Sequence, residues 1–448
     1  MNTTRTTMHE RASKNKEIVP DGYLPRIVDA QINKYLSLFG AVEIAGTKWC
    51  GKTWAARAHG ASITYVDRGN NPQVIASDSQ IALQGDRPHV IDEWQRVPSV
   101  WDTVRHAVDD AGGKKGLWIL TGSSTPHKDE VFHSGAGRIG RIRMYPMSLS
   151  ESGESSAKIS LASLFEEKTK GKLEPCQASP SLTDLLEVAC RGGWPEALNL
   201  SSSEAQIIVH SYLQSIFEQS IPARGKSSDI AERIVSSIAR NLCQSTTIKT
   251  INADISGKEN SQKIAATEKT IASYLNELAA LFLYDGIKGW APPARSPKRV
   301  QLKEKRYFAD PSIAVAALGL SPESLLNDWQ TFGLVFENLC IRDLLVYARA
   351  LPKASGTPVR YYRDDSGLEV DAIIERTDGS WAAIEIKLSE EKVQEGIDSL
   401  LRLKSKLTSN PLAKVREPSF LAVLVGVSEY ARQTKEGVYV IPIRTLGA

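Results

Sequence analysis

Two glycines, a lysine and a threonine follow the spacing G-x-x-x-x-G-K-[ST] in the stretch "EIAGTKWCGKTWAA". In this pattern the glycines let backbone amides converge on phosphate oxygens, the lysine adds positive charge, and the hydroxyl can bind Mg²⁺. An apolar run precedes the motif and a helical pattern follows it, which is the context that a phosphate-binding loop needs. The predicted nucleotide contacts are Gly46, Thr47, Lys48, Gly51, Lys52, Thr53 and Trp54.

Two later apolar runs in the sequence are followed directly by polar side chains. "HVIDEW" ends in Asp92 and Glu93, about 40 residues after the loop, where such proteins place a magnesium-binding aspartate. Glu93 is predicted to orient and deprotonate a water. "LWILTGSS" supplies Thr121 and Ser123, whose hydroxyls are predicted to contact the γ-phosphate or that water. Taken alone, each stretch also fits a solvated strand end.

Arg138 and Arg141 lie in the glycine-rich stretch "SGAGRIGRIRMYP". An arginine there suits the role of an arginine finger, which stabilises charge that develops during phosphoryl transfer. The alternative is a pair of solvated surface arginines. A finger that acts on a neighbouring copy would require a homo-oligomer.

A second group of acids lies near the C-terminus. "LEVDAIIERTDGSWAAIEIKLS" places Asp371 on one expected strand, and Glu385 and Lys387 on the next. If these strands pair, Asp371 lies close to Glu385, and the two carboxylates could bind Mg²⁺ while Lys387 acts in catalysis. Together with Glu337 in a preceding helix, this order resembles the core of the PD-(D/E)xK nuclease fold. In the alternative, Lys387 only pairs with Asp371 or Glu385.

The pattern of apolar residues predicts an α/β chain in several parts. Short apolar runs alternate with helical patterns after Tyr23, which indicates a parallel sheet covered by helices. A mainly helical section follows, and a second α/β section ends the chain. We expect a disordered tail at 1–20, a nucleotide-binding domain at 21–155, a helical section at 156–320 and a C-terminal domain at 321–448.

An ordered set of motifs carries a family resemblance: "YLPRIVD", "GTKWCGKT", "VIDEWQRVPSVWDTVRHAVD", "WILTGSS", "SGAGRIGRI", "YPMSLSE", "RGGWPEAL", "RYFADPSIA" and "FGLVFENL". The set resembles prokaryotic AAA-type ATPases that carry an uncharacterised conserved C-terminal domain. The resemblance implies a P-loop NTPase fold, ATP binding, and Mg²⁺-dependent hydrolysis supported by Asp92 and Glu93. One departure is the central loop sequence, where family members usually carry arginine and a small or polar residue in place of Lys48, Trp49 and Cys50.

The middle section ends in a basic segment. Residues 286–307 hold seven basic residues and one acid, Glu304, after a helical pattern in "TIASYLNELAALFLYDGI". This arrangement looks like the recognition helix and wing of a winged-helix module, so DNA contact through this segment and the C-terminal domain is one prediction. A solvated hairpin or a protein-interaction spacer is the alternative. "RGGWPEAL" is interpreted as a packing or hinge element.

Composition sets limits on location and partners. The 448 residues have a formal charge of only +3, so any nucleic-acid surface must be local. The five cysteines form no CxxC pair, which disfavours a disulfide framework and a zinc ribbon. Because the sequence lacks both an apolar leader and an apolar run of about 18 residues, we expect a soluble cytoplasmic protein with no membrane contact.

Three functional hypotheses follow. The first is an ATPase that uses Mg²⁺ and ATP to drive or gate a nuclease-like C-terminal domain, with DNA as its candidate partner. The second is a metal-dependent nuclease regulated by ATP. The third is a nucleotide-switched binding protein whose nuclease-like domain is inactive.

Overall fold

The computed structural model describes residues 18–125, 134–166, 176–178, 181–256, 266–409 and 415–448. Most of the predicted tail at 1–20 therefore lies outside the described residues. The chain forms two compact units. Unit 1 comprises residues 1–146 and 280–282, and unit 2 comprises residues 147–279 and 283–448.

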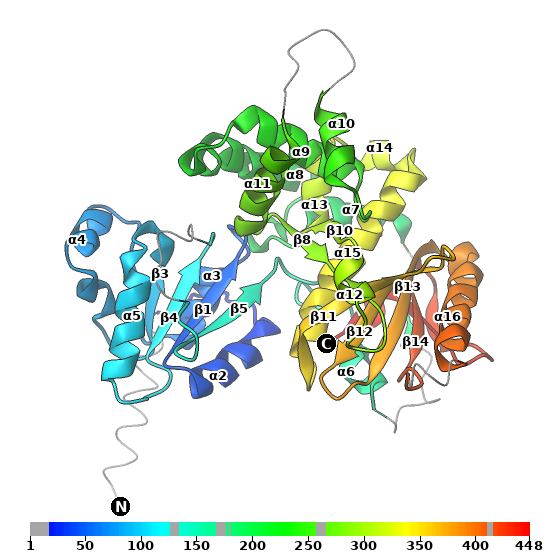
Figure 1. The fold of residues 1–448 in the computed structure, drawn as a ribbon, viewed down its shortest axis with the longest axis horizontal. Helices are drawn as coiled ribbons and strands as arrows, with labels where there is room; N and C mark the ends of the chain where they lie inside the picture. Colours follow the sequence, from blue (N-terminus) through cyan, green and yellow to red (C-terminus); the bar gives the residue numbers. More distant parts are fainter. Residues whose placement is uncertain (1–17, 126–133, 167–175, 179–180, 257–265, 410–414) are drawn as a thin grey trace, which may run out of the picture. The chain divides into compact units, whose positions relative to one another are not determined.

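Unit 1 contains one parallel five-stranded sheet of order β2-β3-β4-β1-β5. Its strands are β1 (Ala41–Gly46), β2 (Ser62–Tyr65), β3 (His89–Asp92), β4 (Trp118–Gly122) and β5 (Ile139–Met144). The connecting helices are α2 (Val28–Leu38), α3 (Lys52–His59), α4 (Asn71–Ser77), η1 (Ser79–Leu83), η2 (Trp94–Arg96) and α5 (Ser99–Asp110). The predicted parallel α/β arrangement of this part is thus confirmed (Figure 1).

Alternation along the strands of unit 1 gives the sheet an apolar surface on both faces. Val42 and Ile119 pack in one hydrophobic cluster with residues of α2 and α3. Their strand neighbours Ala41 and Leu120 pack in another cluster with residues of α5. Since successive strand residues point to opposite faces, short apolar runs are sufficient to cover both sides of the sheet.

Unit 2 begins with a mainly helical part. Its elements up to residue 326 are β6 (Ile159–Ser160), α6 (Leu161–Leu164), β7 (Cys176–Gln177), α7 (Leu182–Arg191), η5 (Pro195–Ala197), α8 (Ser202–Ser215), η6 (Ile216–Ser220), η7 (Pro222–Arg224), α9 (Ser228–Arg240), α10 (Ile248–Ser256), α11 (Glu268–Ala280), β8 (Tyr284–Ile287), β9 (Gly289–Trp290), α12 (Lys298–Gln301), β10 (Lys305–Phe308), α13 (Pro311–Ala317) and α14 (Pro322–Leu326). Strands β8 and β10 form an antiparallel pair where the wing is predicted.

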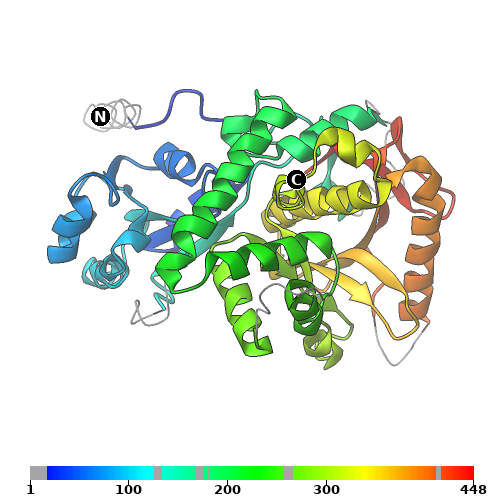
Figure 2. The ribbon, with the colours of Figure 1, turned by 90° about the horizontal axis from the view of Figure 1, so that it is seen from above.

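The rest of unit 2 is a mixed sheet with flanking helices. Its elements are α15 (Trp329–Ala350), β11 (Ala354–Arg363), β12 (Glu369–Arg376), β13 (Trp381–Ser389), η8 (Glu390–Lys392), α16 (Val393–Thr408), β14 (Leu421–Val427), β15 (Tyr430–Gln433), β16 (Tyr439–Pro442), η9 (Ile443–Thr445) and β17 (Leu446–Gly447). The strand order of the large sheet is β7-β15-β16-β14-β13-β12-β11-β9. Helices α15 and α16, yellow and orange in Figures 1 and 2, lie on opposite sides of it.

The edges of this sheet come from the preceding section. Strand β9 pairs with β11 at one edge, and β7 pairs with β15 at the other. These pairings cross the division that we predicted at 320/321, so the helical section and the C-terminal section form one compact unit. The edge strands have two residues each, a length too short for a periodicity to be visible in the sequence.

Candidate functional site

The glycine loop connects β1 to α3 in unit 1. A Cβ on Gly46 would lie 2.2 Å from the backbone oxygen of Met144, and Gly51 has a φ of 97°. The first position therefore needs glycine because the β5 backbone is so close, and the second because the left-handed conformation disfavours a side chain. Both glycines of the motif are explained by the backbone of the loop.

Within the loop, two polar groups are arranged for a ligand. The Lys52 ammonium is buried and donates to the backbone oxygen of Thr47 at 2.6 Å. The hydroxyl of Thr47 is buried and has no hydrogen-bond partner among the described residues. Burying an unpaired hydroxyl is costly, so this loop fits a group that brings hydrogen-bond acceptors, such as a phosphate.

Asp92 lies at the end of β3, beside the loop. Its Oδ1 accepts hydrogen bonds from the hydroxyls of Thr53 at 2.8 Å and Thr121 at 2.6 Å. Burial raises the pKa of Asp92, while these two hydroxyls oppose the shift. In a parallel sheet of order β3-β4-β1, the carboxyl ends of the strands share one edge, which brings the three side chains together. Oxygen atoms of Thr53 and Asp92 fit the ligand preference of Mg²⁺.

Glu93 follows Asp92 in a left-handed conformation, with φ of 56°. Its Oε2 accepts from the Ser123 hydroxyl at 2.8 Å and from the Gln95 amide at 2.5 Å, and Gln95 also donates to Ser123 at 3.1 Å. The structure therefore joins Glu93 to Ser123 as one polar group. Gln95 is not among the residues predicted from the sequence, although it stands two residues after Glu93 in "DEWQ".

Arg26, in the motif "YLPRIVD", binds the backbone of the glycine loop. Its guanidinium donates to the backbone oxygens of Cys50 and Tyr145, each at 2.9 Å. Cys50 is buried in the hydrophobic cluster under the loop, whereas Trp49 has a φ of 64° and is 46% exposed. The two unassigned loop residues thus have different environments: the cysteine is part of the core, and the tryptophan is on the surface.

Two further predicted contacts border the loop. Trp54, in the first turn of α3, is 45% exposed. Burial and the nearby positive charges of Arg96 and Lys52 lower the pKa of Lys48, while Glu93 opposes the shift. The nucleotide contacts predicted for Lys48 and Trp54 stay predictions.

The two candidate arginine fingers lie away from the loop within their own chain. Strand β5 runs parallel to β1 and pairs Ile139 with Ala41 and Met144 with Gly46. Arg138 precedes Ile139 and therefore lies at the opposite end of the strand from Gly46, about 20 Å away along the strand. Arg138 pairs with Asp109 at 2.8 Å, and Arg141 pairs with the buried Glu43 at 3.0 Å. A finger role for Arg138 would therefore have to be in trans.

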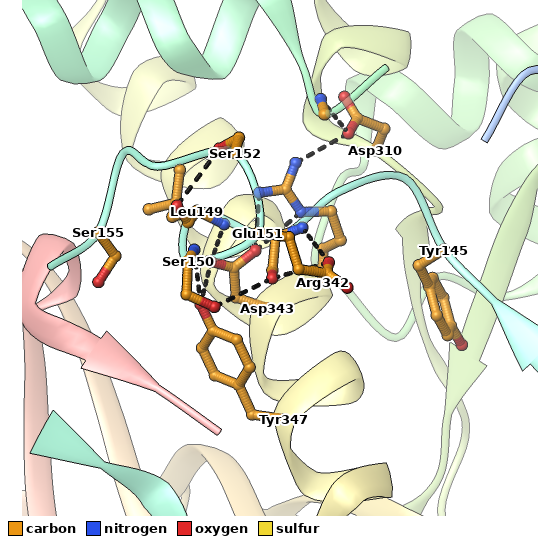
Figure 3. Close-up of polar contacts among 12 residues, drawn as sticks. Tyr145, Leu149, Ser150, Glu151, Ser152, Ser155, Asp310, Arg342, Asp343 and Tyr347 are labelled. Atoms are coloured by element: carbon orange, nitrogen blue, oxygen red, sulfur yellow. Dashed lines mark hydrogen bonds and ion pairs between the residues drawn. The ribbon is translucent and has the colours of Figure 1, made fainter. Parts of the chain in front are cut away.

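Unit 2 is organised around a buried arginine, Arg342 of α15 (Figure 3). Its guanidinium donates to Asp310 at 2.9 Å and to Asp343 at 2.9 and 2.7 Å. Asp343 also accepts from the Leu149 amide at 3.0 Å and from the Tyr347 hydroxyl at 3.2 Å. Every charge in this cluster has a partner, so the contacts shown in Figure 3 are those of a structural core.

The motif "RGGWPEAL" packs against the same cluster. The Gly193 amide donates to Asp310 at 2.9 Å, and the Trp194 indole donates to Ser312 at 2.9 Å. A Cβ on Gly193 would lie 2.1 Å from the backbone oxygen of Met147. This close approach explains the glycine and supports the packing interpretation of the motif.

The C-terminal acids come together as the sequence order indicated. Strands β12 and β13 pair antiparallel with Ala372 opposite Ile384, and Asp371 Oδ2 accepts from the Ile386 amide at 2.9 Å. Lys387 donates to Glu385 at 2.7 Å. Glu337 of α15 accepts from the Tyr307 hydroxyl at 2.7 Å.

An unpredicted lysine lies among these acids. The Lys305 ammonium, from β10, is 2.5 Å from Glu369, 3.6 Å from Glu337 and 3.9 Å from Asp371. The three carboxylates raise the pKa of Lys305 against the opposing effect of burial. The sequence showed Lys305 only as one charge of a basic segment, because the contact depends on how β10 packs against α15.

Burial and mutual repulsion shift the acids themselves. Desolvation, together with Asp371, raises the pKa of Glu337 to about 7 and that of Glu385 to about 9. No three or more histidine, cysteine, aspartate or glutamate side chains are placed to hold a metal ion, within the part of the chain that the structure describes. Two roles stay predictions: metal binding by Glu337, Asp371 and Glu385, and catalysis by Lys387. The ammonium group of Lys305, which lies among these acids, does not favour a metal ion there.

The basic segment at 286–307 is partly neutralised inside unit 2. Lys298 pairs with Asp365 at 2.7 Å, and Arg299 makes two bonds of 2.8 Å with Glu375. The exposed residues Lys288, Arg295 and Lys303 have no ion pair among the described residues. No described helix has the length and apolar character that a membrane span requires.

Three family models match successive parts of the chain. Residues 39–153 match an AAA domain, residues 182–324 match a domain of unknown function (DUF8612), and residues 332–446 match another domain of unknown function (DUF4143). No curated protein is significantly similar to the chain. The PD-(D/E)xK and winged-helix assignments of unit 2 are not supported by these matches and stay predictions.

Similar solved structures include a Walker-type ATPase of Pyrococcus abyssi, at 14% identity and a TM-score of 0.41 over 67% of this chain and 97% of that one. Another is the RuvB Holliday junction branch migration motor of Thermotoga maritima, at 15% identity and a TM-score of 0.28 over 69% of this chain and 99% of that one. Such low scores carry no functional argument. The loop geometry, the parallel sheet and the AAA family match together identify the N-terminal unit as an AAA-type P-loop NTPase domain.

Proposed function

We propose that unit 1 binds ATP with Mg²⁺ and hydrolyses it. The observation that carries this proposal is the group formed by Asp92 and Glu93 with the hydroxyls of Thr53, Thr121 and Ser123, directly beside the glycine loop. A phosphate-binding loop alone supports binding. A second acid, held in place next to the magnesium-binding one, is what supports hydrolysis.

The residues have distinct proposed roles. Backbone amides of the loop from Gly46 to Gly51 bind the phosphates, and Lys52 leaves the Thr47 carbonyl to reach the terminal phosphate groups. Thr53 and Asp92 would hold Mg²⁺, which when bound neutralises charge on the phosphate oxygens.

Glu93 accepts a proton from the attacking water as the new oxygen–phosphorus bond forms and the bond to the ADP oxygen breaks. Ser123 and Gln95 hold the Glu93 carboxylate so that its free oxygen can face the water. Thr121 contacts the γ-phosphate side of the site. Arg138 or Arg141 serves as a finger in trans, which requires self-association of the chain.

The test is steady-state ATP hydrolysis, with ATP binding measured separately by calorimetry. Lys52→Ala is expected to lower turnover by about 10²-fold or more, because it removes a charge aimed at the transferred phosphoryl group. Lys34→Ala, at an exposed lysine of α2, is the matched control and should keep full activity. Equal turnover in the two variants would contradict the proposal.

A nucleotide-switched binding protein is the second candidate. The observation that favours it over an ATP-regulated nuclease is the lysine within the carboxylate group of unit 2. Wild-type protein that binds ATP but never hydrolyses it, with or without DNA, would establish the switch.

DNA is a proposed partner of the basic segment. Lys288, Arg295 and Lys303 are the candidates for phosphate contacts, because Lys298 and Arg299 already have acidic partners. Changing all three candidates to glutamine should weaken DNA binding in a gel shift, whereas an unchanged affinity would remove this surface from consideration.

A further inference from the structure

The ammonium group of Lys305 occupies the centre of the acidic group in unit 2. Strand β10, which carries it, packs against α15 (Figure 1), and the lysine is only 3% exposed. Its nitrogen lies 2.5 Å from Glu369, 3.6 Å from Glu337 and 3.9 Å from Asp371. Burying a lysine is costly unless it is paired, and here three carboxylates compensate for the cost.

The carboxylates also have other donors from the protein. Tyr307 donates to Glu337 at 2.7 Å, and the Ile386 amide donates to Asp371 at 2.9 Å. Glu385 accepts from Lys387 at 2.7 Å. Four acids thus face two lysines and a set of neutral donors, which engage one oxygen or more of each acid.

Geometry leaves no space for both cations. Mg²⁺ requires oxygen ligands at about 2.0–2.1 Å, arranged around a single point. The ammonium nitrogen already lies within 2.5 to 3.9 Å of all three carboxylates. Because two positive charges at one position repel strongly in a buried environment, the lysine and a divalent ion exclude each other.

Ions in solution can nevertheless reach this position. Lys305 and Glu369 line a cavity of about 350 Å³, together with Arg363 and the loop that precedes α10. Ions in this cavity can therefore approach Lys305 and Glu369. Occupancy of the centre is decided by the competition between the ammonium group and a divalent ion.

We propose that Lys305 is the permanent cation of this carboxylate group and takes the place of a divalent metal. In the wild-type chain the centre is therefore independent of metal, and loss of the lysine lets the side chains of Glu337, Glu369 and Asp371 readjust to bind an oxygen-seeking divalent cation. The proposal does not depend on ATP hydrolysis by unit 1.

The test measures Mn²⁺ binding to the full chain by electron paramagnetic resonance, with thermal unfolding recorded in parallel. Every variant also carries Asp92→Asn, which removes the acid that we assign to Mg²⁺ in unit 1. Lys305→Met is expected to gain one Mn²⁺ site with a dissociation constant on the order of 10⁻⁴ M, as in weak carboxylate sites. Its unfolding temperature should rise with Mn²⁺.

Two controls locate the new site. Lys303→Met changes an exposed lysine two residues away and should bind no additional Mn²⁺. Adding Asp371→Asn to Lys305→Met should abolish the gained site. If Lys305→Met binds no Mn²⁺, the lysine does not replace a metal and the proposal is wrong.

The unsubstituted centre provides a test that does not depend on the folding of Lys305→Met. The Asp92→Asn protein should bind no Mn²⁺ that Asp371→Asn can remove, and Lys305→Arg, which keeps the positive charge, should behave in the same way. Should the Asp92→Asn protein bind one Mn²⁺ that is lost on Asp371→Asn, the centre accepts a metal beside its lysine and the proposal is overturned.

Discussion

The two units each gather acidic side chains, but they hold them with different donors. In unit 1, the described hydrogen bonds to Asp92 and Glu93 come from neutral groups, namely the hydroxyls of Thr53, Thr121 and Ser123 and the Gln95 amide. In unit 2, the acids accept from the ammonium groups of Lys305 and Lys387 as well as from neutral groups. The first arrangement keeps its negative charge available to a cation, and the second cancels much of it.

This difference shows that the order of acidic residues in the sequence does not by itself determine whether their carboxylates are available to bind a cation. Both groups follow the spacing expected of a metal site. A neutral donor positions a carboxylate without changing its charge, whereas a lysine competes with any other cation. The predictions below test this contrast, and the first concerns the acid of unit 1 that we assign to proton transfer.

Glu93→Gln should reduce ATP turnover by about 10²- to 10⁴-fold, because the amide cannot accept the proton of the attacking water. ATP binding should be retained, since Lys52 and the loop amides are unchanged. Single-turnover hydrolysis and calorimetry measure the two effects. Asp86→Asn, at an exposed acid of the same unit, is the control and should keep wild-type turnover. Full activity in Glu93→Gln would contradict the proton-transfer role that distinguishes the acids of unit 1 from those of unit 2.

Arg342→Met should destabilise unit 2 by about 3–5 kcal/mol, because it leaves Asp310 and Asp343 buried without their cation. Urea unfolding followed by hydrogen exchange measures the loss in each unit separately. Arg402→Met, at an exposed arginine of α16, should change stability little. Equal effects of the two substitutions would show that the charges in Figure 3 do not stabilise this unit.

Acidification from pH 7 to pH 5 should affect the two units in opposite directions. In unit 1, burial lowers the pKa of His89 from 6.5 to about 4, so the unfolded state binds the proton more readily and stability falls as the pH drops below 6.5. In unit 2, the pKa of Glu337 is raised from 4.5 to about 7, so the folded state binds the proton more readily and stability is lost as the pH rises through 7.

We expect changes of about 1–2 kcal/mol in each unit, a decrease in unit 1 and an increase in unit 2. Hydrogen exchange of the two units at both pH values measures them. His89→Gln should reduce the response of unit 1 only, and Glu337→Gln should reduce that of unit 2 only, where Glu385, whose pKa is also raised, retains part of the response. A response of the same sign in both units would contradict the assignment.

Ser123→Ala should have the smallest effect, a decrease in turnover of about fivefold. The substitution removes one hydrogen bond to Glu93, worth about 1 kcal/mol, while Gln95 still holds the carboxylate. The Michaelis constant for ATP should not change. Ser124→Ala, at the next position, is the control; a comparable loss there would mean that the strand end, and not the contact with Glu93, is responsible.

Much of unit 1 could be predicted because its contacts follow from strand order. The loop motif, the acids after β3 and the hydroxyls after β4 meet because parallel strands end at one edge of the sheet. Arg138 was harder to place: its position at the far end of β5 follows from the register of β5 on β1, which the sequence does not reveal.

In unit 2, the local pairing of Asp371 with the strand of Glu385 could be predicted from a single hairpin. The contact of Lys305 with three acids could not, since it joins strand β10 to helix α15 and strand β12. The same holds for Arg342 and its neighbour Asp343, whose respective partners Asp310 and Leu149 lie far from them in the chain.

Residue types and spacing were therefore enough to specify the nucleotide loop, its acid pair and the class of the N-terminal domain, because these depend on local geometry and on one rule of sheet topology. Packing between distant segments decided which charges are cancelled, which arginines lie away from the loop, and that the helical and C-terminal sections form one unit. The physical reason is that the charge available to a ligand depends on every group within a few ångströms, and most of those groups are remote in the sequence.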